Sequence, residues 1–367
     1  MSAITTGRDP VTGLVSEGRQ RQGDLIIRAA SMAFVSLVLI QVLFKSEFIT
    51  FGFASWLPVL IGFTVWSVAL CAGNIVRGGE AGWRALFVLP AVLFTLALVI
   101  FPTFFGLYIA FTDWNLSSAT GRQFNGLANF YQLINDPYFW NALGNMVFYV
   151  LTVLVQYAIA FCLALLLNAD IRAQKFFRVA FLLPFMLSPV AVSWMIGKSM
   201  LEYRFGPVTK LLRYLGWENP SLLTSPWLAK MTIAAMDAWV WIPFMMILLL
   251  AGLQAQSKEI HEAAKVDGAT GWQSFWQITF PLMLPVSVTT IVLRIIFQLK
   301  LADIVINTTS GGPGGATDTI SSFIFREYKD RSNVGYGTMI AEVYLIIIIV
   351  FVVLLLKFTN RFMQRQV

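Results

Sequence analysis

Two apolar stretches of the chain each carry three side chains at the spacing i, i+4 and i+7, which places residues on one face of a helix. They are Asp237, Trp241 and Phe244 in residues 231–253, and Arg294, Gln298 and Leu301 in residues 283–306. Aromatic rings stack on the faces of a sugar, while charged and amide groups make directed hydrogen bonds to its hydroxyls. If the two faces oppose each other, these residues predict a site for a polar, ring-shaped ligand.

A polar loop at residues 255–282 has a regular spacing of its own. It reads Glu262-Ala263-Ala264, three residues, Gly268, nine residues, Ile278, one residue and Phe280-Pro281. Ser257 can cap a first short helix, and Thr270 with Gln273 has the capping-box spacing that opens a second. Gly268 lies between them, where a turn with positive φ favours glycine. The loop therefore predicts two short helices joined at a glycine.

The composition requires most of the chain to lie in a membrane. Hydrophobic residues make up 57% of the 367 residues and charged residues only 12%, whereas soluble domains carry about 25% charged residues. Stretches near the ~20 residues that cross a bilayer predict an all-α polytopic membrane protein with about eight transmembrane helices. The predicted spans are 29–44, 52–76, 85–111, 145–167, 179–200, 231–253, 283–306 and 337–356.

An even number of spans places both termini on one side of the membrane. Lys and Arg are modestly enriched in the tails and in the loops on the same side, which predicts that this side is cytoplasmic. The net charge of +7 then indicates contact with lipid head groups rather than with nucleic acid. The predicted parts are a cytoplasmic tail at 1–28, an accessory pair at 29–76, a core at 85–356 that contains the loop 255–282, and a cytoplasmic tail at 357–367.

Several kinds of chemistry are excluded by residue counts and spacing. Two cysteines and one histidine cannot build a disulfide framework or a metal cluster. The sequence contains no Gly-x-x-x-x-Gly-Lys-Ser/Thr phosphate loop, and the glycines at 311–315 are interpreted as a flexible turn. We therefore expect no catalytic residues, metal or cofactor, and the chain is not predicted to be an enzyme.

The Glu-Ala-Ala loop resembles the EAA motif of permease subunits in binding-protein-dependent ABC importers, with Phe280 where the motif has leucine. The segments Phe-Thr-Asp-Trp-Asn at 111–115 and Gly-Gly-Pro-Gly-Gly at 311–315 are similar to the carbohydrate-importing branch, the maltose and glycerol-phosphate type. The resemblance covers about residues 85–360. The pair at 29–76 resembles, in number and position, the two extra N-terminal helices of the maltose permease subunit.

This resemblance implies a type I importer permease core of six helices that moves a sugar or glycoside across the inner membrane. It also implies a second permease subunit in a heterodimer, a homodimeric ATP-binding subunit that hydrolyses ATP, and a periplasmic solute-binding protein. The ATPase-coupling positions would be Glu262, Ala263, Ala264, Gly268, Ile278 and Pro281. Counted without gaps from the motif, the sugar-lining positions would be Asp237, Val240, Trp241, Phe244, Arg294, Gln298 and Leu301.

Arg294 leaves two interpretations open. The maltose subunit is uncharged at the corresponding position, so Arg294 predicts a cargo with an acidic group such as a sulfonate, carboxylate or phosphate. Alternatively, Asp237 and Arg294 neutralise each other or a partner subunit, and the cargo is a neutral sugar. Gln156 and Asn145 are predicted to make interhelical hydrogen bonds. An ion-coupled secondary transporter is the alternative function, because transporters of that kind also place charged residues such as Asp237 and Arg294 inside the membrane.

Overall fold

The computed structural model describes residues 17–45, 48–119, 121–169 and 172–364, and these are almost entirely helical. Seven helices are long and apolar enough to cross a membrane, or eight if one bent pair counts as a single span, among the described residues. The chain divides into two compact units, Met1–Phe105 and Gly106–Val367. The prediction of an all-α membrane protein with about eight spans is confirmed.

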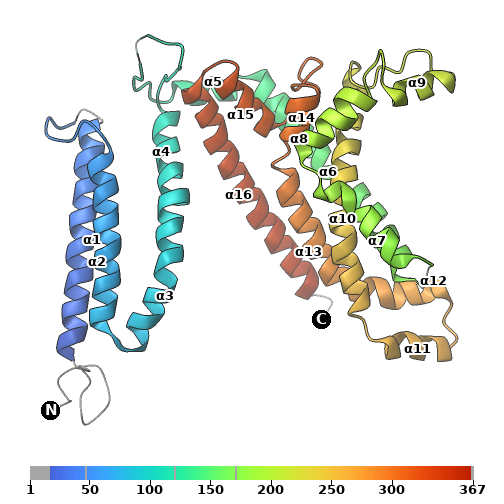
Figure 1. Ribbon diagram of the computed structural model, residues 1–367, viewed down its shortest axis with the longest axis horizontal. Helices are drawn as coiled ribbons and strands as arrows, with labels where there is room; N and C mark the ends of the chain where they lie inside the picture. The colour runs from blue at the N-terminus through green and yellow to red at the C-terminus, as the bar shows by residue number, and fades with distance from the viewer. Residues whose placement is uncertain (1–16, 46–47, 120, 170–171, 365–367) are drawn as a thin grey trace. The chain divides into compact units, whose positions relative to one another are not determined.

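The first unit begins with a helical hairpin (Figure 1). Its segments are α1 (Glu17–Lys45), α2 (Leu57–Arg77), α3 (Gly79–Thr95), the π-helical η1 (Leu96–Ile100) and the start of α4 (Phe101–Ala110). The fully buried Gln41 fixes the connection between α1 and α2, because its amide donates to the Phe53 carbonyl at 2.9 Å and the Ser55 carbonyl at 3.2 Å.

Helix α1 begins at Glu17, within the predicted N-terminal tail 1–28. Residues 17–28 are mostly polar and basic, but Glu, Arg and Gln are good helix formers and extend the helix of the following apolar span. Arg77 of α2 pairs with Asp24 in this extension at 3.4 Å. Residues 1–16 lie outside the described part of the chain.

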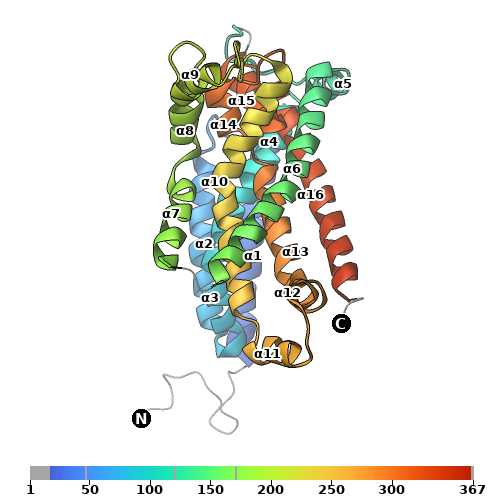
Figure 2. The same ribbon diagram turned by 90° about the vertical axis from the view of Figure 1, so that its right-hand side faces the viewer.

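The second unit contains the remaining helices. They are α5 (Ala128–Ile134), α6 (Pro137–Asn168), α7 (Gln174–Met186), α8 (Pro189–Val192), the π-helical η2 (Ser193–Met200), α9 (Pro207–Tyr214), α10 (Pro226–Gln254), α11 (Lys258–Val266), α12 (Gly271–Ser274), the π-helical η3 (Phe275–Thr279), α13 (Phe280–Gln298), α14 (Asp303–Thr308), α15 (Ile320–Lys329) and α16 (Val334–Gln364). Helices α6, α10 and α13 pack against one another (Figure 2) and supply most of the core of this unit.

The predicted span 179–200 is bent rather than straight. Helices α7 and α8–η2 meet at an angle of 93° across Leu187 and Ser188. Both residues are extended, and Ser188 caps α8 by accepting a hydrogen bond from the Ala191 amide. The residue before a proline avoids the helical region, so Pro189 accounts for the break.

The predicted span 283–306 is wrong at its C-terminal end, because α13 ends at Gln298 and α14 starts only at Asp303. The carbonyls freed at this end find other donors, as the end of a buried helix requires. Tyr344 donates to the Leu299 carbonyl at 2.7 Å, and Thr319 donates to the Leu301 carbonyl at 2.5 Å. Leu301 therefore lies beyond the helix, and the i, i+7 relation to Arg294 does not apply to it.

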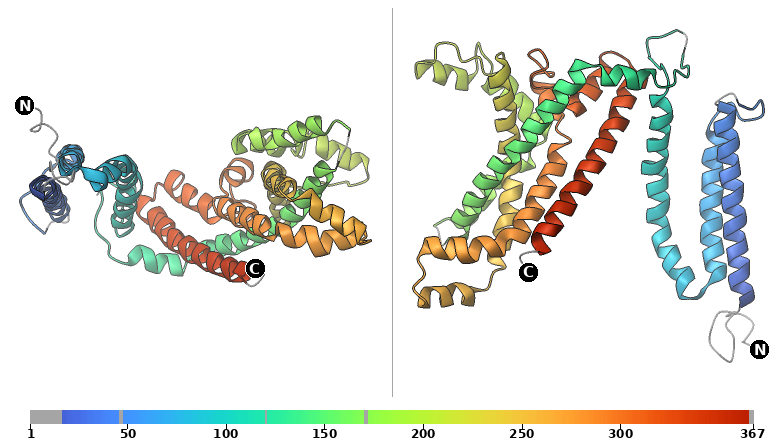
Figure 3. Two further views of the ribbon diagram at one scale, coloured as in Figure 1. Left: turned by 90° about the horizontal axis from the view of Figure 1, so that it is seen from below. Right: turned by 180° about the vertical axis from the view of Figure 1, so that it is seen from behind.

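The loop 255–282 lies at one end of the second unit, where α11 and α12 lie one above the other (Figure 3). The predicted capping box is present, with Thr270 and Gln273 bonded reciprocally. The second helix is not a separate element, however. It continues through η3 into α13, so that Gly271–Gln298 forms one apolar helix. The π-helical η3 ends two residues before Pro281, which has no N–H to donate to the preceding turn.

Candidate functional site

Three buried polar side chains from three helices form a closed network inside the second unit. Arg294 of α13 is paired with Asp237 of α10 through Nη2 and Oδ2. Its Nε donates to Oε1 of Gln156 on α6 at 2.9 Å, and Nε2 of Gln156 donates to Asp237 Oδ2 at 3.2 Å. The network ties together the three helices at the centre of the unit.

This network is sealed from solvent. The exposed fraction is 0% for Arg294, 1% for Asp237 and 2% for Gln156. A buried charge is strongly unfavourable without a partner, and each of these two charges neutralises the other. The predicted mutual neutralisation of Asp237 and Arg294 is therefore present in this conformation of the chain.

The network leaves hydrogen-bonding capacity unused. Arg294 Nη1 and both amide atoms of Gln298 are buried without a hydrogen bond of ordinary geometry to any described residue. Gln298 lies one turn beyond Arg294 on α13 and is fully buried. Buried polar groups are nearly always satisfied by protein, water or ligand, so these atoms are available to a polar molecule that enters the site.

Aromatic rings cover the guanidinium. The Trp241 ring centroid lies 4.9 Å from Arg294 Cζ, within the range of a cation–π contact. Phe297 stacks on Trp241 with centroids 4.8 Å apart, and Phe185 contacts Trp241 at 5.7 Å and Phe244 at 5.6 Å. Phe185 belongs to α7 and lies two residues before Leu187, where the bend begins, so movement of the bent span would alter this cover.

The structure brings together most, but not all, of the residues predicted for a ligand site. Asp237, Trp241, Arg294 and Gln298 lie around one buried point, and Phe244 joins them through its ring contact with Trp241 at 5.8 Å. Val240 and Leu301 belong to an apolar cluster with Ile304 and Val305, against which Trp241 also packs.

The loop predicted to contact an ATPase presents a short exposed helix. Glu262 and Ala263 of α11 are exposed, whereas Ala264 is buried. Gly268 ends the helix with φ +79°, and a Cβ built there would meet no atom within 4 Å. Ile278 lies in η3 and is half-buried, while Pro281 is exposed in the first turn of α13.

A hydrogen-bonded bridge connects this loop to both helices of the ion pair. Gln256, just after α10, donates to the carbonyl of Thr279 at the start of α13 at 3.3 Å. His261 of α11 contacts Gln256 Oε1 through Nε2 at 3.0 Å. Helices α10 and α13 are thus joined twice, within the spans by Asp237 and Arg294 and at the loop end by Gln256.

Sequence reasoning did not assign Gln156, Phe185, Phe297 or Gln256 to a site. The interhelical role predicted for Gln156 is confirmed, but its partners were unknown. Asn145 bonds instead to the carbonyls of Gly315 and Asp318, at 3.0 and 2.9 Å, in the segment before α15. Gln156 could have been noticed as a polar residue in an apolar helix. Phe185 and Phe297 could not, because an aromatic residue in an apolar helix does not indicate which rings it contacts.

The match to known proteins decides the family. A family model for the inner membrane component of binding-protein-dependent transport systems matches residues 161–365. The chain belongs to this family. The membership in the binding-protein-dependent ABC importer permeases that the Glu-Ala-Ala loop predicts is confirmed.

Two relatives illustrate the similarity of this permease to sugar transport subunits. The trehalose/maltose transport system permease protein MalF of Thermococcus litoralis is 31% identical, and the match covers 76% of this chain and 94% of that protein. The sulfoquinovosyl glycerol transport system permease protein SmoG of Agrobacterium fabrum is 32% identical over 72% of this chain and 86% of its own.

A solved structure supports the fold of this permease. A bacterial ABC transporter involved in the import of the acidic polysaccharide alginate contains a chain that superposes with a TM-score of 0.66 at 23% identity. The match covers 76% of this permease and 95% of that chain. The type I importer fold is therefore shared, and the family match with the apolar helices makes the permease a multi-pass inner membrane protein.

Proposed function

We propose that this permease carries a sugar derivative through a midplane site built on Arg294, Gln298 and Asp237, with Trp241 and Phe244 against the sugar ring. The unpaired Nη1 of Arg294 and the unpaired amide of Gln298 carry this proposal. They offer donors and an acceptor at one buried point beside aromatic faces, the combination that sugar sites use.

The charge of the cargo depends on how the ion pair responds to it. Arg294 keeps its charge, and the guanidinium matches oxyanions in pairs. An acidic group on the cargo could replace Asp237 as the partner of Arg294 and accept two hydrogen bonds from the guanidinium. A neutral sugar would leave the Asp237–Arg294 pair in place and accept a hydrogen bond only from Nη1. The names of the two relatives, for a sulfo sugar derivative and for trehalose and maltose, are consistent with either cargo.

We favour an acidic glycoside, and the variant Arg294→Gln tests this choice. Uptake of an acidic glycoside and of its uncharged analogue is measured in the same vesicles. Selective loss of the acidic compound, by about 10-fold or more for a charge-assisted hydrogen bond worth ~1.5–3 kcal/mol, is expected. Equal loss of both compounds, with normal assembly, would assign Arg294 to a structural role and the cargo to the neutral class.

The proposed machine includes a second permease subunit, two copies of an ATP-binding subunit and a periplasmic solute-binding protein. The exposed α11 is the surface on this chain that would enter a groove of the ATP-binding subunit. Purification after mild solubilisation should recover these polypeptides together. An ion-coupled transporter is the alternative, and uptake by this chain alone in liposomes under an imposed ion gradient would support that alternative.

A further inference from the structure

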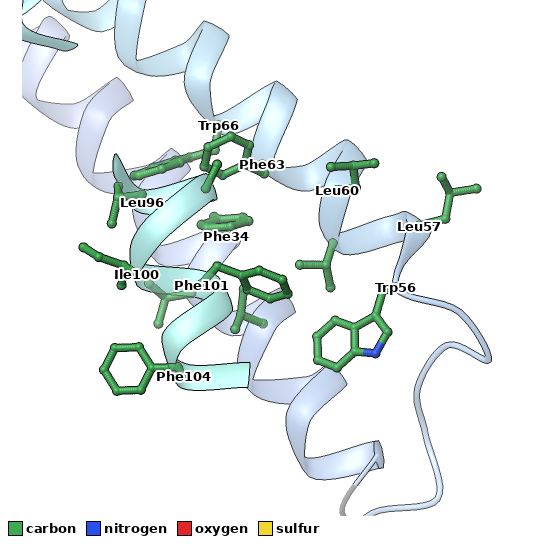
Figure 4. Close-up of a pocket in the computed structure, with 14 residues that line it drawn as sticks. Phe34, Trp56, Leu57, Leu60, Phe63, Trp66, Leu96, Ile100, Phe101 and Phe104 are labelled. Atoms are coloured by element: carbon green, nitrogen blue, oxygen red, sulfur yellow. The ribbon is translucent and has the colours of Figure 1, made fainter. Parts of the chain in front are cut away.

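The first unit contains an apolar hollow that the transport mechanism does not use. Its volume is about 740 Å3, and Figure 4 draws the 14 side chains that line it, from α1, α2, η1, α4 and the residue before α2. Phe34 and Trp66 form one wall, stacked at 4.9 Å, and Phe63 contacts Trp66 at 5.8 Å. We call this feature the N-terminal hollow.

Polar atoms are kept out of the N-terminal hollow or lie at its edge. The indole nitrogen of Trp66 is engaged elsewhere, because it donates to Ser31 Oγ at 3.0 Å. Trp56 contacts Phe101 with centroids 6.3 Å apart and brings the indole nitrogen that Figure 4 draws among these side chains. Helices α1, α2 and α3–α4 are each apolar enough to cross a membrane. The medium beside the hollow is therefore hydrocarbon rather than water.

A cation is bonded to the loop that leads to Trp56, one of the lining residues. Lys45, at the end of α1, donates from Nζ to the carbonyl of Ala54 at 2.6 Å, two residues before Trp56. Gln41 holds the same connection through Phe53 and Ser55. Lysine and tryptophan side chains near the end of a transmembrane segment are the groups that meet lipid head groups.

We propose that the N-terminal hollow binds an acyl chain of an anionic phospholipid whose head group lies against Lys45 and Trp56. The positive charge selects an anionic head group, and the apolar lining takes the chain. A partner helix fits less well, because a helix with its side chains is about 10–12 Å across and would cover the hollow rather than fill it. An unfilled hollow would forfeit the dispersion contacts of its aromatic lining.

Photocrosslinking of the full-length chain in nanodiscs tests this site. The probe is phosphatidylglycerol with a diazirine on one acyl chain, and adducts are mapped by peptide. Ala97→Phe fills the hollow from η1, and Leu98→Phe is the matched control because Leu98 is exposed outside the lining. Adducts on the lining segments should fall about fivefold with Ala97→Phe and stay unchanged with Leu98→Phe.

The head group is tested by Lys45→Gln. This variant should reduce the preference for phosphatidylglycerol over phosphatidylcholine about fivefold, the effect of one basic residue at a membrane surface.

A second pair of variants repeats the filling test if Ala97→Phe elutes as an aggregate. Leu60→Trp fills the hollow, and Ile61→Trp, at an exposed neighbouring position, is its control. Equal labelling in filling and control variants would mean ordinary surrounding lipid and overturn the site. A preference unchanged by Lys45→Gln would overturn the head-group assignment, and loss of adducts when partner subunits are present would show that a protein covers the hollow.

Discussion

Arg294 has an acidic partner, an amide partner and an aromatic ring around one guanidinium that is fully buried. Two of these contacts come from α10 and one comes from α6. The contacts of Arg294 therefore depend on how α6, α10 and α13 are placed relative to one another. A rearrangement that separates α10 from α13 must break the pair or expose it. The network is thus a constraint on how α6, α10 and α13 can move, in addition to its proposed role in binding the cargo.

The first prediction concerns the cost of breaking this network. Asp237→Ala leaves the guanidinium buried and without its counter-charge, which costs about 3–5 kcal/mol in comparable sites. The unfolding midpoint of the purified chain in detergent should therefore fall markedly. Asp24→Ala is the matched control, because the Asp24–Arg77 pair is about 40% exposed and such pairs contribute about 0–1 kcal/mol.

A triple variant distinguishes a charge effect from simple loss of packing. Replacing Gln156, Asp237 and Arg294 together by leucine removes the charges along with their need for partners, and such replacements are often neutral for stability. The triple variant should be more stable than Asp237→Ala and should not transport. A triple variant less stable than the single one would mean that the network stabilises the fold by itself.

The opposing faces of α10 and α13 could be predicted because helical spacing fixes which side chains share a face. Asp237, Trp241, Arg294 and Gln298 follow from that spacing. Leu301 does not, because the carbonyls at the end of α13 are bonded by Tyr344 and Thr319, residues far along the chain. The sequence also could not pair Gln156 with Arg294 across 138 positions.

At the scale of elements, the turn at Gly268 gives the second prediction. A residue with a Cβ is disfavoured at φ +79° by about 1–2 kcal/mol, although no atom would clash with it. Gly268→Val should insert and assemble normally but reduce substrate-stimulated ATP hydrolysis of the reconstituted complex. Gly271→Val is the control, because Gly271 is equally open and does not have positive φ. Stimulation that is unchanged by Gly268→Val would contradict the coupling role of the loop.

The bridge through Gln256 gives a third prediction for the same assay. Gln256→Leu keeps the size of the side chain but removes its bonds to Thr279 and His261. A hydrogen bond contributes ~1 kcal/mol, so we expect stimulated hydrolysis to fall about fivefold while basal hydrolysis is retained. The exposed Gln254→Leu serves as the control. Equal effects of the two variants would show that the bridge does not transmit movement from α11.

Element boundaries were predictable where the chain itself marks them. Thr270 and Gln273 form the capping box that their spacing predicts, and Pro189 marks the break after α7. The angle of 93° at that break was not predictable, because a proline disfavours helix before it without setting the direction of the next segment. The continuity of α12 with α13 was missed because the capping box at Thr270 predicts where a helix begins but not where it ends, and η3 continues this helix into α13.

At the scale of the whole molecule, the elements of the second unit are sorted to its two ends. Helices α11 and α12 lie at one end, and α5, α9 and α15 lie at the other (Figures 1 and 2). The spans α6, α10, α13 and α16 run between these ends. A charge-based orientation of any one loop therefore fixes the orientation of all the others in this unit.

The last prediction tests that orientation. In a chain freed of Cys71 and Cys162, single cysteines are placed next to His261, Gly126 and Gly314. Membrane-impermeant reagent applied from outside should label the sites near Gly126 and Gly314, and the site near His261 should react only after the membrane is permeabilised. The excess of Lys and Arg in the tails and in the loops on the same side supports this orientation. External labelling near His261 would invert the protein in the membrane, place α11 on the periplasmic face and remove its proposed contact with an ATP-binding subunit.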